Sequence, residues 1–207
     1  MLFRSDRLLV ESLEKGFSTI FAQRSADQLQ SAARQSFLRT MLSDLLERGV
    51  QAVPAEWQLS LYRMIGGART KHLCQRDIKL HGTALIVDAV RFLVLSKLSS
   101  GQWMPHGTVE RLQWLERNHI MSKDEASALI EAFEALTHWR LEKQMAMLAK
   151  RSDEHMCASG NRGSDQEMPA PNHINLLALH SNERSHFRAY VQSIAQLRER
   201  LRMDFAA

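Results

Sequence analysis

The sequence has little cysteine, and its two cysteines are not spaced for a disulfide framework or a zinc site. Cys74 and Cys157 lie far apart, and neither belongs to a Cys-x-x-Cys pair. Disulfide-rich domains and zinc modules need several cysteines or histidines at short spacings. The nine histidines also lack the His-Glu-x-x-His spacing of a helical zinc site. We therefore expect two reduced thiols, no metal site and no cofactor.

Long hydrophobic runs are also missing. The longest, residues 84–95, contains Asp88 and Arg91, whereas a membrane-spanning helix needs about 20 mostly uncharged residues. The first residues carry Arg4, Asp6 and Arg7 where a secretory signal would need its apolar stretch. We expect a soluble cytoplasmic protein that does not interact with a membrane.

A large excess of one charge is absent too. The chain has 27 Lys and Arg against 23 Asp and Glu, a net charge of +4. The arginines are spread along the chain among glutamates, which is typical of solvated helix faces. No motif combines aromatic and basic residues, so a nucleic-acid partner is not favoured, although the charge does not exclude one.

Glycine and proline are scarce, with 9 and 4 residues, and apolar residues recur at steps of three and four throughout. This pattern predicts an all-α protein without strands. In the first half of the chain, we predict one helix or two over about residues 6–47, ended by Gly49, and a short helix from Pro54 to Gly66-Gly67. A third region, residues 83–98, is predicted to be a helix ended by Ser99-Ser100-Gly101. Three more helices are predicted: one capped by Thr108, one from the Ser122 and Glu125 capping box to about Lys150, and one from Ser181 or Asn182 to the C-terminus.

The helix at 83–98 has the widest apolar stripe, so we place it at the centre of an antiparallel bundle with four or five core helices. Residues 1–70 are predicted to form an N-terminal helical extension, and residues 71–207 the bundle. Residues 151–171 contain Ser, Asp, Gly, Asn and two prolines without periodicity, which predicts a flexible loop.

Several strings in the sequence are more specific than this helical pattern. They are Arg76-Asp77-Ile78-Lys79-Leu80-His81-Gly82, Ile86-Val87-Asp88-Ala89-Val90-Arg91, Thr108-Val109-Glu110-Arg111-Leu112, the run from Leu136 to Gln144, Asn172-His173-Ile174 and Asn182-Glu183-Arg184. Together they resemble the substrate-binding domain that follows the catalytic domain in a family of bacterial nucleotidyltransferases, distantly similar to the protein-PII uridylyltransferases.

The resemblance implies a binding function. In that family the catalytic domain carries a Gly-Ser turn followed by paired carboxylates that hold metal and nucleotide. The only similar string here, Gly163-Ser164-Asp165, lies in the predicted loop without a flanking strand. We therefore expect that another chain supplies the nucleotidyltransferase domain or that the domain was lost in this lineage. We also expect that this chain alone does not transfer nucleotides and that the bundle binds a small anionic or protein substrate.

Eight residues are candidates for substrate binding: Asp77, Lys79, Gly82, Arg91, Arg111, Arg140, Gln144 and Arg184. Helical spacing places Arg140 and Gln144 on the packed side of their helix. A buried guanidinium needs an anionic partner, so Arg140 is expected either to pair with Asp88 or Glu110 or to contact an anionic substrate.

The other candidates also have a structural and a functional interpretation. Asp77, Lys79 and Gly82 precede the central helix, where they can cap it or face a phosphate. Arg91 is spaced to pair with Asp88, and Arg111 follows Glu110 on a neighbouring helix, so both are interpreted mainly as ion-pair residues. Arg184, in the first turn of the last helix, is expected to point outward, toward a ligand or another chain.

Two other functions remain open at this point. Arg76 and His81 also match the Arg-x4-His pattern of HEPN-type ribonucleases, in which both side chains assist attack of a ribose 2′-hydroxyl on the adjacent phosphate. Alternatively, the chain is a scaffold or regulatory subunit that forms a homo-oligomer through Leu9, Leu13 and Phe17.

Overall fold

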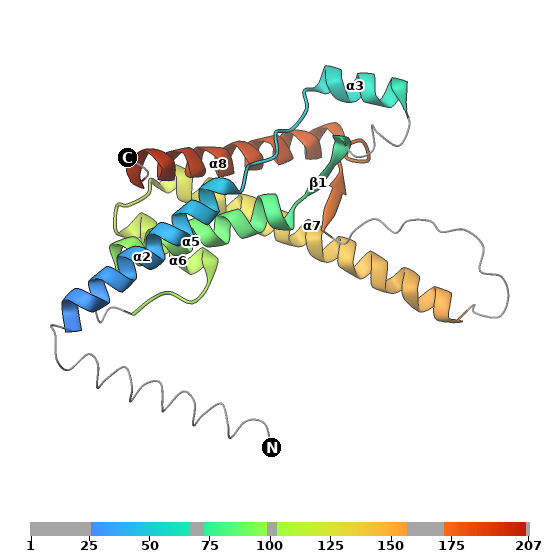
Figure 1. Cartoon of the computed structure of the whole chain (residues 1–207). Coiled ribbons are helices and arrows are strands. Elements are labelled where there is room, and N and C mark those ends of the chain that lie inside the picture. Colours follow the sequence, from blue (N-terminus) through green and yellow to red (C-terminus); the bar gives the residue numbers. More distant parts are fainter. Residues whose placement is uncertain (1–25, 67–72, 99–102, 157–171, 206–207) are drawn as a thin grey trace. The chain divides into compact units, whose positions relative to one another are not determined.

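The structure, a computed structural model, describes residues 26–66, 73–98, 103–156 and 172–205 (Figure 1). The chain divides into two compact units, residues 1–43 and 44–207. The described part of the first unit is helical and belongs to α2 (Ala26–Glu47). The second unit contains the last turn of α2 and all other described elements. Among the described residues, no helix is both long enough and apolar enough to cross a membrane.

Four helices of the second unit build its core. They are α5 (Ala84–Lys97), α6 (Thr108–Arg117), α7 (Lys123–Met156) and α8 (Ser181–Phe205). The helix α5 packs against α6 and α8, and α7 packs against the same two helices (Figure 1). The prediction of an all-α bundle is therefore confirmed.

The central position predicted for α5 agrees with its burial. Seven of its 14 residues are buried apolar side chains, and they occupy more than one face of the helix. They are Leu85, Ile86, Ala89, Val90, Phe92, Leu93 and Val94. The neighbouring helices contribute Leu112 and Leu115 from α6, Leu129 and Leu136 from α7, and Phe187, Ile194 and Leu197 from α8. Removal of this apolar surface from water is the main stabilising contribution to the unit.

Helix starts are set by polar side chains, not always those expected. Ser122 accepts a hydrogen bond at its Oγ from the Glu125 N–H (3.2 Å), as predicted for the start of α7. Thr108, predicted to be a cap, is instead the first residue of α6. The Glu110 carboxylate accepts the N–H groups of His106 and Gly107 (both 3.2 Å) and so fixes this start.

The helix α3 (Glu56–Ile65) begins two residues after Pro54, later than predicted, because the Gln58 side chain accepts the Ala55 N–H (2.8 Å). Gly66 ends α3 with a φ of 64°, a left-handed conformation that glycine adopts at little cost. Gly49 was expected to end α2 in the same way. That prediction is wrong, because among the described glycines only Gly66 has a positive φ.

The helix α7 continues to Met156, so the predicted loop begins later than residue 151. The physical reason is that residues 151–156 contain neither glycine nor proline to stop the helix. Residues 157–171, which include Gly163-Ser164-Asp165, lie outside the described residues. The same is true of Leu9, Leu13 and Phe17, and of Ser99-Ser100-Gly101.

The absence of strands was also predicted wrongly. The strand β1 (Gln75–Asp77) pairs antiparallel with β2 (His173–Asn175), and Asp77 stands opposite His173. Strands of three residues are too short to show alternation in a sequence. Between β1 and α5 lies η1 (Lys79–Thr83), a single π-helical turn. The small sheet therefore attaches the segment before α8 to the start of the central helix.

Candidate functional site

The π-helical turn η1 is the structural centre of the candidate site. The Thr83 N–H donates to the Ile78 carbonyl five residues earlier (3.0 Å), which defines the turn. The Asp77 Oδ1 accepts the N–H groups of Lys79 (2.9 Å) and Leu80 (2.8 Å) and caps the turn. The capping interpretation of Asp77 therefore agrees with the geometry. Single π-helical turns often occur at functional sites.

Gly82 allows η1 to approach α7 closely. A Cβ atom at Gly82 would lie 3.0 Å from Cδ1 of Leu136 on α7. That separation is shorter than an ordinary carbon–carbon contact of about 3.5–4.0 Å. Gly82 is buried, so the structure gives it a packing role against α7, and it also lines a shallow hollow beside η1.

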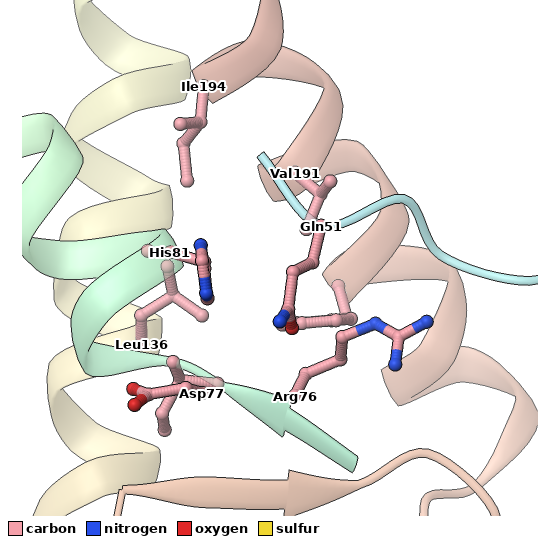
Figure 2. A pocket seen from close by; sticks show the side chains of 10 residues that line it. Gln51, Arg76, Asp77, His81, Leu136, Val191 and Ile194 are labelled. Carbon is pink, nitrogen blue, oxygen red and sulfur yellow. The ribbon is translucent and has the colours of Figure 1, made fainter. Parts of the chain in front are cut away.

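A shallow hollow lies beside η1 (Figure 2). Its lining includes Gln51, Arg76, Asp77 and His81, with an apolar floor of Ile78, Leu136, Phe187, Val191 and Ile194. The hollow and its open mouth together hold about 250 Å³. Most of this volume is open solvent, and the enclosed part measures only about 10 Å³, room for about one water molecule. The hollow therefore does not enclose a nucleotide.

Arg76 reaches the hollow with its stem, and backbone carbonyls bind its guanidinium. Nε (3.2 Å) and Nη2 (2.9 Å) donate to the Ala52 carbonyl, and Nη1 donates to the carbonyls of Leu73 (2.7 Å) and Gln75 (2.8 Å). Four of the five guanidinium N–H groups are thereby used. Burial lowers the pKa of Arg76, against smaller opposing effects of Cys74 and Tyr62. Arg76 therefore holds the chain around Ala52 to the start of β1.

His81 is oriented by a single strong hydrogen bond. Its Nδ1 lies 2.7 Å from the Gly49 carbonyl oxygen. A carbonyl only accepts, so Nδ1 carries the hydrogen and Nε2 is left as the other ring nitrogen for a contact at the hollow. Figure 2 shows His81, Gln51 and Leu136 among the residues that line the hollow.

Arg140 of α7 approaches the far end of η1. Its Nη1 donates to Thr83 Oγ1 (3.4 Å), and its Nε is buried without a hydrogen-bond partner. The expected pair with Asp88 or Glu110 does not form. Asp88 instead pairs with Arg48 (2.7 Å), and Glu110 is bound to the backbone at the start of α6.

Two further polar residues near η1 come from β2 and the residue before it. The Asn172 carbonyl accepts the Ile78 N–H (2.9 Å). The Asn172 Oδ1 and the His173 Nδ1 are buried without partners. The string Asn172-His173-Ile174 is among those that resemble the family, but no local spacing predicts that Asn172 and His173 belong to the site, because only the strand pairing places them beside η1.

The remaining candidates lie elsewhere. Arg91 of α5 is exposed and stands 4.0 Å from the Asp88 carboxylate. Arg111 of α6 donates from Nε to the Pro105 carbonyl (2.9 Å). Burial lowers the pKa of Arg111, and the positive charge of Arg91 adds to this effect, whereas Glu110 opposes it. Gln144 lies one helical turn beyond Arg140 and is half-buried.

Arg184 was expected to point outward, and this is wrong. Only 11% of its side chain is exposed, and its Nε lies 3.2 Å from the Glu56 carboxylate. Arg188 lies 2.8 Å from the same Glu56 oxygen. The two arginines lower the pKa of Glu56 mainly through these hydrogen bonds. These two ion pairs therefore hold the start of α3 against the start of α8.

The eight predicted residues consequently form three groups. Asp77, Lys79, Gly82, Arg140 and Gln144 belong to η1, its flanks and α7; Arg91 and Arg111 belong to α5 and α6; Arg184 binds α3. No cluster of three or more His, Cys, Asp or Glu side chains that could hold a metal occurs in the described part of the chain.

The fold and site thus define a helical bundle with a polar junction at η1 and no described metal cluster. Residues 35–205 match the family described as "Putative nucleotidyltransferase substrate binding domain". The match covers most of the chain, and the protein belongs to this family. Searches of curated proteins and of solved structures gave no match.

Proposed function

We propose that this bundle binds the substrate for nucleotidyl transfer, and that a nucleotidyltransferase domain outside residues 1–207 performs the transfer. The family is named for substrate binding, and its match spans the whole bundle. The observation that carries the proposal is the junction at η1. There, hydrogen bonding and strand pairing join the specific strings at 76–82 and 172–174, and Arg140 of the string at 136–144 donates to Thr83, the residue directly after the first string.

The polar groups at this junction suit recognition rather than chemistry. Arg140, Asn172 and His173 offer N–H donors and an acceptor, and the Asp77 oxygen that caps η1 is already engaged. A nucleotidyltransferase centre needs carboxylates that coordinate Mg²⁺ through free oxygens. The substrate is expected to be a small anionic molecule or a protein that presents an anionic group.

A thermal-shift screen tests the binding function. The purified chain is heated with nucleoside triphosphates, small anionic metabolites or short RNA, and Arg140→Ala serves as the control. A ligand at about 100 times its Kd should stabilise the fold by roughly 2.7 kcal/mol. A shift that disappears in Arg140→Ala supports the proposal. The absence of any shift would contradict it.

A labelling experiment tests whether nucleotidyl transfer requires a catalytic domain in addition to this chain. The chain alone, incubated with Mg²⁺ and α-labelled nucleoside triphosphates, should yield no labelled product. Addition of a nucleotidyltransferase domain from the same family should permit labelling of a bound acceptor. Labelling by the chain alone would show that this polypeptide carries its own catalytic centre.

One observation favours the ribonuclease alternative, since Arg76 and His81 both line the hollow. The carbonyl bonds of Arg76 oppose it, because an arginine that stabilises a phosphate needs free N–H groups. A cleavage assay with labelled single-stranded RNA decides the matter. Cleavage that is lost in His81→Ala would establish the ribonuclease.

A further inference from the structure

Most buried polar atoms without partners in the described part of the chain belong to segments attached to η1. Four such side-chain atoms occur among the described residues, and three of them belong to Arg140, Asn172 and His173. The fourth, Nε of Arg198, belongs to a guanidinium that donates from Nη2 to the Leu46 carbonyl. Buried polar atoms are nearly always hydrogen-bonded in folded proteins. Three exceptions on segments attached to one turn therefore require an explanation.

A continuous set of hydrogen bonds connects these residues. The Asn172 carbonyl accepts the Ile78 N–H (2.9 Å), and the Ile78 carbonyl accepts the Thr83 N–H (3.0 Å). The Thr83 hydroxyl then accepts from Arg140 Nη1 (3.4 Å). His173 follows Asn172 directly and stands opposite Asp77 in the sheet. The three unpartnered atoms thus belong to segments that are all attached to η1.

The geometry of the Arg140 guanidinium indicates which kind of hydrogen-bond acceptor it lacks. Nη1 is used by Thr83, and it lies on the opposite side of the guanidinium from the Nε–H. The Nε–H and the nearer Nη2–H form a planar fork that matches two oxygens of one carboxylate or phosphate. Nε is buried and unpartnered, and Nη2 makes no hydrogen bond to the described residues. The two N–H groups of the fork are therefore held in place without a hydrogen-bond acceptor.

The local charge is compatible with an anion. No carboxylate of the described chain lies within ion-pair distance of Arg140. The two acids expected to pair with it bind other groups, since Asp88 pairs with Arg48 and Glu110 accepts backbone N–H groups. Lys79 on η1 is exposed and adds a second positive charge. Asp77 is the opposing negative charge, and its Oδ1 is bound to two backbone N–H groups. A half-buried guanidinium without a counter-charge is stabilised by an incoming anion.

We infer that the Nε and Nη2 edge of Arg140 binds an oxyanion, the phosphate or carboxylate group of the substrate, with the Nδ1–H of His173 as a further donor. This inference rests on the proposed function, since it names the chemical group by which the bundle recognises its substrate. The site lies where η1, α7 and β2 meet, and the hydroxyl of Thr83 positions the guanidinium.

Titration calorimetry with inorganic phosphate and with succinate tests the inference, because the two probes carry the two possible anionic groups. One of them should bind the intact chain. Arg140→Lys keeps the charge but removes the fork, and it should weaken binding by about tenfold or more. Arg202→Lys, a substitution of an exposed arginine on α8, should leave binding unchanged. The ¹H–¹⁵N resonance of Arg140 Nε should shift on titration.

A second variant keeps the test conclusive if Arg140→Lys does not fold. His173→Phe keeps an aromatic side chain, with a larger ring, and removes the ring nitrogens, so it should also weaken binding of the same probe. If neither probe binds the intact chain, the inference is overturned. It is also overturned if the intact chain and Arg140→Lys bind the probe equally well. Binding of phosphate or succinate without any shift in the wider metabolite screen would preserve the oxyanion site and refute the proposed function.

Discussion

The contact between α3 and α8 leads to a quantitative prediction. Glu56 accepts hydrogen bonds from Arg184 Nε (3.2 Å) and Arg188 Nη1 (2.8 Å). The Glu56 side chain is 49% exposed, so solvent screens both interactions, and exposed ion pairs contribute about 0–1 kcal/mol. Because Arg184 is mostly buried, we take the upper end of this range. Glu56→Gln should therefore destabilise the attachment of α3 by about 1 kcal/mol, or roughly fivefold in its opening equilibrium.

Hydrogen exchange measures this opening directly. The Leu59 N–H donates to the Ala55 carbonyl (3.0 Å), and the Gly66 N–H donates to the Tyr62 carbonyl (3.1 Å). In Glu56→Gln, exchange at residues 56–66 should accelerate about fivefold while exchange in α5 stays unchanged. Glu199→Gln is a suitable control, since it removes an exposed ion pair confined to α8. Equal acceleration in α3 and α5, or none in α3, would refute the reasoning.

The same contact predicts a dependence on pH. The arginines hold the pKa of Glu56 below its ordinary value of 4.5 in the folded chain. The carboxylate therefore contributes stability above pH 4.5, and this contribution is lost as the pH falls through the lowered folded pKa. Exchange of α3, corrected for its intrinsic rate, should rise in this acidic range in the natural chain. In Glu56→Gln it should not show this step.

Three other substitutions test the packing around the site. Gly82→Ala should lower the free energy of unfolding by about 1–3 kcal/mol, because the added Cβ would lie 3.0 Å from Leu136 Cδ1; chemical denaturation should show a smaller loss in a Leu136→Val background. Leu115→Ala removes a fully buried side chain of α6 and should cost about 2–5 kcal/mol by the same measurement. Tyr190→Phe removes the hydrogen bond from Tyr190 Oη to Glu131 (3.1 Å) and should lower the melting temperature through a loss of about 1 kcal/mol.

The helices could be predicted from the sequence because their signals are local. The apolar repeat of α5 and the cap formed by Ser122 depend only on residues a few positions apart. The boundary of α7 was less accurate, since a helix continues until a glycine, a proline or a competing contact stops it. Local periodicity does not define such a boundary to within a few residues.

The parts that the sequence did not predict depend on distant contacts. Arg184 and Glu56 are 128 residues apart, so no spacing rule relates them. The pairing of Asp77 with His173 likewise depends on the register of two three-residue strands. The resemblance to the family did point to Asp77, Gly82 and Arg140, although it could not separate a residue that shapes η1 from one that faces a ligand.

The structure suggests why these two roles are hard to separate at η1. Thr83 belongs to the π-helical turn through its N–H and holds Arg140 through its hydroxyl. Gly82 brings the same turn against α7, the helix that carries Arg140. The geometry of the turn therefore determines where the guanidinium fork points. Because a disruptive change in any of these residues would alter both packing and binding, conservative substitutions such as Arg140→Lys are more informative than truncation to alanine.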